Sequence, residues 1–502
     1  MPETVNRAAS LQQSMPTTTD LYDIVFRGAL VIDGTGAPAQ VQDVAVIGDR
    51  IAAVGQLSNT SATVEIDARG LTLAPGFIDV HTHDDLEVIR RPQMLAKLSQ
   101  GVTTVITGNC GISAAPALLQ ADPPDPMNLL GQQTEFVYGS FAQYGRAVEL
   151  AAPGVNVAGL VGHTTLRNNV LSDLSKAATA AEIEQMQYMF SQALQDGALG
   201  MSSGLAYHNA AAAPASEVIE VAKDLAKFGG IYTSHLRNEF AEIIPALAEA
   251  ADIGLALKVP VVISHLKCAG VANWGRSEEV LDFIRLRGQQ QALSCDCYPY
   301  AASSSTLDLK QITADFDIFI TWSEPHPAMA GQMLAEIAEQ WQLPLLETAQ
   351  RLMPAGAVYH GMAEADVQNI LQFPPTMVGS DGLPCDPHPH PRLWGSFPRV
   401  IGHYCRDKQL FSLPQAIHKM TGLSASNFRL PQRGVIAANY FADLVLFDSS
   451  KIQDEANFLQ PQRCSAGIEQ VYVNGQLAYQ QGAVTSQRAG RFLRRAAAAS
   501  ID

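Results

Sequence analysis

The 502-residue sequence predicts an α/β protein: a (β/α)8 TIM-like barrel, a small β-sandwich built from both chain termini, and a segment inserted after the seventh strand. Apolar, β-rich runs alternate with helical segments in the middle of the chain, which is typical of a parallel sheet covered by helices. Short alternating strands with Gly-containing turns lie near both ends. Hydrophobic residues form 47% of the chain and charged residues 16%, which indicates a large buried core.

The small domain is predicted from similar patterns at the two ends of the chain. Between residues 21 and 70 the sequence contains DIVFRGALVID, VQDVAVIGDRIAAVG and ATVEIDARG. A similar pattern occurs near the C-terminus in ADLVLFD and IEQVYVNGQLAYQQGAV. Apolar and polar residues alternate in these runs, as in antiparallel sheets with one buried face. We therefore expect residues 21–74 and 430–485 to form one β-sandwich, with a barrel at residues 75–429.

Eight runs in the middle region share continuous apolar character and are candidate strands. They are GFIDVHTH, TTVITGN, NVAGLVGH, GALGMSS, GIYTSHL, VPVVISHLK, ALSCDCYP and PPTMVGSDG. Helical segments such as EIEQMQYMFSQALQDG and SEEVLDFIRLRGQQ separate them. About eight β-then-α units favour a closed barrel. An open, doubly wound sheet is the alternative.

The stretch from about residue 301 to 373 is too long for an ordinary connection of roughly 2–6 residues between a strand and a helix. It contains MAGQMLAEIAEQWQLPLLETAQRLM, which has an amphipathic, helical pattern. We expect an inserted lid or subdomain over the site. A peripheral decoration is the alternative.

The net charge and the absence of long apolar segments limit the classes of partner and the cellular location that we expect. Lys and Arg total 33 and Asp and Glu total 49, so the net charge of −16 argues against a general binder of nucleic acid or anionic membranes. The first twenty residues lack the apolar stretch of a secretory signal, and no run approaches a membrane span, so a cytoplasmic location is expected. Seven cysteines, an odd number, fit reduced thiols.

Polar side chains follow almost every candidate strand. In chain order they are His81, His83, Asn109, Cys110, His163, His235, His265, Lys267, Tyr298 and Asp381. Active sites of such barrels lie at the carboxyl ends of the strands, so these side chains are expected at one mouth. A thiolate with several imidazoles suits zinc better than magnesium or calcium. Histidines that only hydrogen-bond to the backbone are the alternative.

Several motifs carry a family resemblance. They are PGFIDVHTHDD, GVTTVITGNCGIS, LVGHTTLR, DGALGMSSGLAY, YTSHLRNE, VVISHLKC, GSDGLP and PHPRLWGSFPRV. From about Tyr22 to Asn474 the chain resembles the N-acyl-D-amino-acid deacylases, or D-aminoacylases, of the metal-dependent amidohydrolase superfamily. GNCGIS, SHLKC and PHPRLWG are more specific to this group than the HxH element.

The resemblance implies a set of zinc ligands. Cys110, His235 and His265 match the ligands of one tightly bound zinc. His81 and His83 match a second, weaker site that shares Cys110. Many superfamily members bridge two metals with a carboxylated lysine after the fourth strand. This sequence has GALGMSSGL there, without lysine, as in the D-aminoacylase branch.

The resemblance also implies catalytic and substrate-binding residues. Asp381 matches the catalytic carboxylate, which would act as general base and then general acid toward a metal-activated water. The carboxylate of the substrate would meet four matching positions. These are Lys267, Tyr298, Ser304 and Arg392. The triplet SSS leaves the register of Ser304 open.

These features predict zinc-dependent hydrolysis of the amide bond in small-molecule N-acyl-D-amino acids. A cyclic-amide hydrolase of the hydantoinase or dihydroorotase kind is one alternative, disfavoured by the missing lysine. A non-catalytic scaffold is another, disfavoured because all expected ligand types are present. Cys295 and Cys297 share a strand face and resemble a metal pair, but packing is the expected role of CDC on a buried strand.

Overall fold

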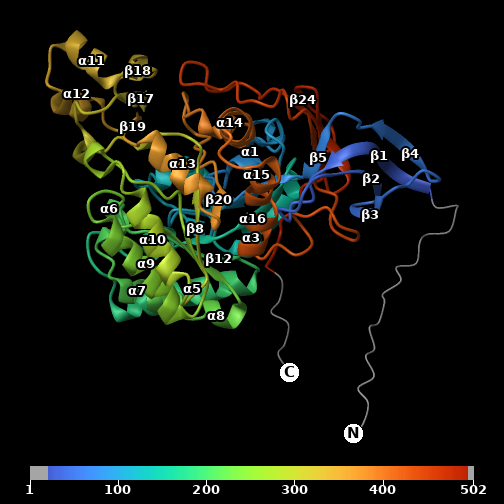
Figure 1. Cartoon of the computed structure of the whole chain (residues 1–502). Helices are drawn as coiled ribbons and strands as arrows, with labels where there is room; N and C mark the ends of the chain where they lie inside the picture. Colours follow the sequence, from blue (N-terminus) through green and yellow to red (C-terminus); the bar gives the residue numbers. More distant parts are fainter. Residues whose placement is uncertain (1–20, 496–502) are drawn as a thin grey trace, which may run out of the picture.

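Strands from both ends of the chain form one sheet. The computed structural model describes residues 21–495. Within them, nine strands are ordered β24-β23-β22-β21-β5-β1-β2-β3, with β4 paired to β1, at one end of the molecule (Figure 1). The strands are β1 Leu21–Val31, β2 Gln40–Ile47, β3 Arg50–Gly55, β4 Ser61–Asp67, β5 Thr72–Pro75, β21 Leu444–Phe447, β22 Ile468–Val473, β23 Gln476–Gln480 and β24 Ala483–Val484.

The two ends of the chain meet where β5 pairs antiparallel with β21. The alternation in the sequence gives these strands an apolar face, and a buried cluster that includes Phe26, Leu73, Leu446 and Tyr472 covers it. The rings of Phe26 and Tyr472 contact edge to face, with centroids 5.2 Å apart. Burial of this face is what holds N-terminal and C-terminal strands in one unit.

Each of the eight apolar runs contains a strand, and neighbouring strands pair in parallel. One sheet has the order β10-β7-β6 and a second has the order β11-β12-β13-β14-β15-β20. Only Leu160 separates β10 from β11, and a parallel bridge between Thr82 and Gly382 links the segments after β6 and β20. The strands are β6 Phe77–Asp79, β7 Val102–Thr107, β10 Asn156–Gly159, β11 Val161–Gly162, β12 Gly200–Gly204, β13 Ile231–His235, β14 Val261–Ile263, β15 Leu293–Cys297 and β20 Thr376–Val378.

Helices connect the parallel strands and pack against them, for example α9 on β14 and α15 on β20. They are α1 Glu87–Arg90, α2 Leu95–Leu98, α3 Phe141–Ala151, α4 His163–Val170, α5 Ala180–Gln195, α6 His208–Ala211, α7 Ala215–Val221, α8 Leu225–Phe228, α9 Ile243–Leu257, α10 Ser277–Arg287, α13 Glu364–Gln372, α14 Arg392–Arg399, α15 Leu413–Met420 and α16 Gly422–Asn427. A π-helix, Val400–Asp407, continues α14, and β8 Ala117–Leu118 pairs with β9 Val137–Tyr138. None of the helices in residues 21–495 is long and apolar enough to cross a membrane.

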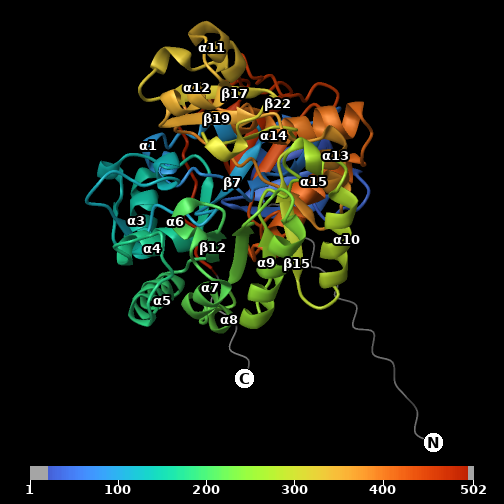
Figure 2. The ribbon, with the colours of Figure 1, turned by 90° about the vertical axis from the view of Figure 1, so that its left-hand side faces the viewer.

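The segment between β15 and β20 forms a sheet of its own. Its four antiparallel strands have the order β16-β19-β17-β18, and α11 and α12 lie over them in both views (Figures 1 and 2). The expected long helix is divided into these two because Gln342 has a left-handed backbone and Pro344 follows. A separate apolar cluster fills this unit. The elements are β16 Ser303–Thr306, β17 Ile318–Ser323, β18 Gln332–Met333, α11 Leu334–Trp341, α12 Leu345–Leu352 and β19 Ala355–Tyr359.

Candidate active site

Side chains from the ends of five parallel strands converge on one buried point. His81 and His83 follow β6, and Cys110 follows β7. His235 ends β13, His265 follows β14, and Asp381 follows β20. Their ligand atoms form two groups that share the Cys110 sulfur, each with all atoms within 4.8 Å. The groups are His81, His83, Cys110 and Asp381, and Cys110, His235 and His265.

The Cys110 sulfur lies between the two groups. It is 3.1 Å from His81 Nε2 and 3.2 Å from His265 Nε2. The Nδ1 atom of His235 is 2.8 Å from His265 Nε2. On the other side, Asp381 Oδ1 is 3.2 Å from His83 Nε2. The nitrogen that each histidine turns toward the cluster is therefore defined.

Strained backbone turns place three of these residues. Cys110, His265 and Asp381 all have positive φ angles, of 54°, 35° and 49°. A non-glycine residue in this region costs about 1–3 kcal/mol, and such strain is concentrated at functional sites. Each of these residues lies two or three positions beyond the end of a parallel strand.

Buried hydrogen bonds hold the segments that carry the cluster. Asp85 accepts from the backbone N–H groups of Gly108, at 3.3 Å, and Ala114, at 3.1 Å, and so fixes both ends of the Cys110 loop. Lys97, fully buried, donates to Asp79 Oδ2 at 2.7 Å and to the Ser380 hydroxyl at 3.0 Å. Asp79 and Ser380 belong to the strand ends that carry His81 and Asp381. This network ties the first strand to the last.

Two carboxylates that the sequence analysis did not single out lie behind the histidine rings. Asp296 Oδ2 is 3.3 Å from His81 Nδ1. Glu239 Oε1 is 3.1 Å from His265 Nδ1. Metal-bound histidines commonly donate their outer N–H to a carboxylate, which fixes the ring orientation. Residues alternate between the two faces of a strand, so LSCDC places Asp296 on the face opposite Cys295 and Cys297. This alternation was a signal in the sequence for the position of Asp296.

The cluster borders a cavity of about 720 Å³. His83, His235, His265 and Asp381 reach its surface. The predicted substrate-binding residues Lys267, Tyr298 and Ser304 line it as well. The inserted unit supplies a wall through Ser303–Gln311, Met353 and Tyr359. The inserted segment therefore contributes directly to the cavity.

Both cations predicted to bind a substrate carboxylate already have carboxylate partners. Lys267 Nζ is 2.5 Å from Glu239 Oε1. Arg392 is buried, and its Nη1 is 3.0 Å from Asp381 Oδ2 while Nη2 donates to the backbone oxygen of Ser304 at 3.0 Å. The Arg392 guanidinium carbon lies 4.6 Å from the centre of the Tyr298 ring. The four predicted residues are thus close together, and Arg392 also contacts the predicted catalytic carboxylate.

Electrostatics keep the two reactive groups of the cluster ionised. Burial alone would raise the pKa of the Cys110 thiol, but the imidazoles of His81 and His265 lower this pKa well below its usual range. Burial would likewise raise the pKa of Asp381, but the Arg392 guanidinium and His265 hold it well below its usual value. A thiolate and a carboxylate are the forms that bind a cation.

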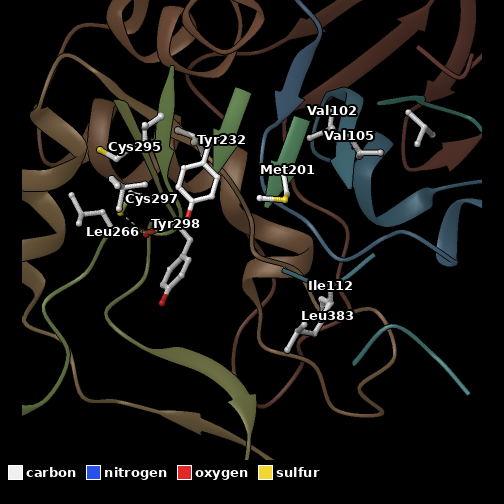
Figure 3. Packing of buried hydrophobic residues seen from close by; sticks show 14 of the residues in the cluster. Val102, Val105, Ile112, Met201, Tyr232, Leu266, Cys295, Cys297, Tyr298 and Leu383 are labelled. Atoms are coloured by element: carbon white, nitrogen blue, oxygen red, sulfur yellow. Dashed lines mark hydrogen bonds between the residues drawn. The ribbon is translucent and has the colours of Figure 1, made fainter. Parts of the chain in front are cut away.

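Some candidates lie away from the cluster. His163 is buried with its Nε2 3.2 Å from Glu217 Oε1, and it does not line the cavity. The Asn109 side chain donates to the backbone oxygen of Ile106 at 2.8 Å. Cys295 and Cys297 lie in the apolar cluster under the helices (Figure 3). All seven cysteines are free.

Comparisons with known proteins identify the family of the chain. A model of the Amidohydrolase family matches residues 64–279 and 333–479. The chain therefore belongs to the amidohydrolase family.

Within this family, characterised deacylases are similar over nearly the whole chain. D-aminoacylase of Alcaligenes xylosoxydans xylosoxydans is 48% identical, over 95% of this chain and 98% of that protein. N-acyl-D-aspartate deacylase of the same organism is 46% identical, over 94% and 95%. At 16% identity and a TM-score of 0.56, a D-hydantoinase shares the fold alone.

Two solved structures connect this fold with metals. A structure of D-aminoacylase superposes with a TM-score of 0.92 at 48% identity, covering 94% of this chain and all of that one. That enzyme has a binuclear metal centre in which one metal activates and the second attenuates. N-acyl-D-glutamate deacylase of Bordetella bronchiseptica, solved with zinc and a phosphonate mimic of the tetrahedral intermediate, has a TM-score of 0.92 at 43% identity, covering 95% and 100%.

Proposed function

We propose that this chain hydrolyses the amide bond of N-acyl-D-amino acids to a carboxylate and a free D-amino acid. The observation that carries the proposal is the convergence of one thiol, four imidazoles and Asp381 in one cluster, of which His83, His235, His265 and Asp381 line the 720 Å³ cavity. The similarity of the chain to several N-acyl-D-amino-acid deacylases supports it.

We also propose the architecture that goes with this function. The parallel strands β6 to β20 close as a (β/α)8 barrel over residues 75–429, with the inserted unit at 301–373 as its lid. Residues 21–74 and 430–485 form the small β-sandwich. The order of the parallel pairs and the bridge between Thr82 and Gly382 support closure.

The donor set fits zinc. Thiolate sulfur and imidazole nitrogen are its usual ligands in proteins. Here the Cys110 sulfur is in direct contact with two imidazole nitrogens, and two of the imidazoles contact each other. Cys110, His235 and His265 would hold a tightly bound ion, and His81 and His83 a second, weaker one beside the same sulfur. Bound zinc would lower the pKa of a water molecule to about 7 and polarise the scissile carbonyl.

The residues of the chain would handle the substrate and the proton. Asp381 is ionised and reaches the cavity, so its carboxylate can accept a proton from the attacking water and return it to the departing amine. Arg392 offers a planar fork and Lys267 a compact charge for the substrate carboxylate. The hydroxyls of Tyr298 and Ser304 lie beside them. Binding of the substrate carboxylate requires Lys267 to interact with that carboxylate and with Glu239 at the same time.

Replacing Arg392 by glutamine should lower kcat/KM for an N-acyl-D-amino acid by about 10²- to 10³-fold, mainly through KM, because a buried charge-assisted contact is lost. A smaller decrease in kcat is expected as well, because Asp381 loses the cation 3.0 Å away. Steady-state kinetics on the acid and on the matching amino acid amide measure both effects. An equal decrease for the neutral amide would contradict the carboxylate role.

A substrate panel tests the function. N-acetyl derivatives of matched D- and L-amino acids with acidic, aliphatic and aromatic side chains should show hydrolysis of the D series only. Hydantoin and dihydroorotate in the same assay address the cyclic-amide alternative. Hydrolysis of cyclic amides alone, or of no amide by zinc-loaded protein, would overturn the proposal; the second result would favour a scaffold.

A further inference from the structure

Asp296 connects the two halves of the ligand cluster. Its Oδ2 faces the His81 ring at 3.3 Å from Nδ1, and its Oδ1 accepts the backbone N–H of His265 at 2.9 Å. His81 belongs to one group of ligand atoms and His265 to the other. We propose that Asp296 is a positioning residue that fixes His81 in the form able to bind the second metal ion. This inference rests on the proposed function.

The environment of Asp296 shows that its carboxylate is committed to these two contacts. It is 1% exposed, and no lysine or arginine in residues 21–495 forms an ion pair with it. Gly379 packs against His81 and Asp296, since a Cβ at position 379 would lie 2.5 Å from His81 Cβ and 2.9 Å from Asp296 Oδ1. A side chain at 379 would therefore separate Asp296 from His81.

Hydrogen bonding to a carboxylate determines which nitrogen of the His81 ring faces the metal side. An ionised carboxylate only accepts hydrogen bonds, so both of its oxygens require donors. His81 can donate from Nδ1 to Oδ2, and this contact turns Nε2, which lies 3.1 Å from the Cys110 sulfur, toward the metal side, where a bound ion would take the place of the Nε2 proton. Asp296 also holds the left-handed turn at His265 through Oδ1.

Asparagine at this position separates the two contacts. In Asp296→Asn the amide oxygen can still accept from His265 N–H, but the NH₂ group then faces His81 and requires an acceptor at Nδ1. His81 would then keep its proton on Nε2, and this proton would compete with a metal ion for that nitrogen. The variant should therefore affect the half of the cluster that contains His81 and His83 and spare the half that contains His235 and His265.

The experiment is a metal titration of apoprotein with cobalt(II), followed by absorption and by equilibrium dialysis. Wild type should bind two ions. In Asp296→Asn the second ion should bind about 10- to 100-fold more weakly, with altered d–d bands, while the first is nearly unchanged. Cys295→Ser is the matched control, because it changes a neighbouring buried residue on the opposite face of β15 and should bind both ions normally.

Gly379→Ala is a second test in case Asp296→Asn does not fold, and it should weaken the second ion in the same direction. Unchanged second-ion affinity in the folded variants, equal loss of both ions, or a single-ion wild type would each overturn the proposal. No substrate enters the titration, so a failure of the deacylase assignment would be seen separately in the substrate panel.

Discussion

Asp381→Asn is expected to reduce kcat on an N-acyl-D-amino acid by roughly 10³- to 10⁴-fold, the range for loss of a general acid and base. Asparagine keeps the shape of the side chain but cannot accept the proton. Its neighbours, His83 at 3.2 Å and Arg392 at 3.0 Å, remain in place. Zinc content should stay near one tightly bound ion, since the group of Cys110, His235 and His265 does not include Asp381.

The measurement combines steady-state rates with metal analysis of the same sample. Asp125→Asn is a suitable control, because Asp125 also lines the cavity but belongs to neither ligand group. Its turnover should be close to that of wild type. Normal turnover in Asp381→Asn would remove Asp381 from the catalytic role, and loss of the tight zinc would show that it acts as a ligand.

Cys110→Ala should affect zinc content as well as turnover, because both ligand groups contain this sulfur. We expect loss of bound zinc and a decrease in turnover of at least about 10³-fold, since water without a metal has a pKa near 15.7. Zinc per chain and kcat on the same preparation test this expectation.

The control for Cys110→Ala is Cys405→Ala, which removes a partly buried thiol in the π-helix. That variant should keep its zinc and its turnover. A Cys110→Ala protein with a full zinc complement and normal rates would contradict the assignment of the shared ligand.

The main strands were predictable because their signal is local. Each buried parallel strand is a continuous apolar run, so its position can be read without knowing its neighbours. The strands of the inserted unit were not predicted, since β16 reads SSST and pairs only with the distant β19. What buries them is the cluster around Ile320 and Ile337, which forms only after the chain has folded.

The candidate ligands were predictable by residue type and position at strand ends, whereas their supporting residues were not. Asp296 stands between two cysteines, which are themselves possible metal ligands, although alternation puts it on the other face of the strand. Glu239 lies in a loop four residues after His235, where no periodic pattern applies. The pairing of Arg392 with Asp381 depends on the fold around β20 and α14.

The sheet built from both ends of the chain has a consequence for biosynthesis. Strand β5 pairs with β21, about 370 residues later in the chain. At roughly 5–20 residues per second, ribosomes would take on the order of 20–70 s to synthesise that interval. During this time the edge of β5 that later pairs with β21 has no native partner, so the nascent chain exposes an unpaired strand edge until β21 emerges.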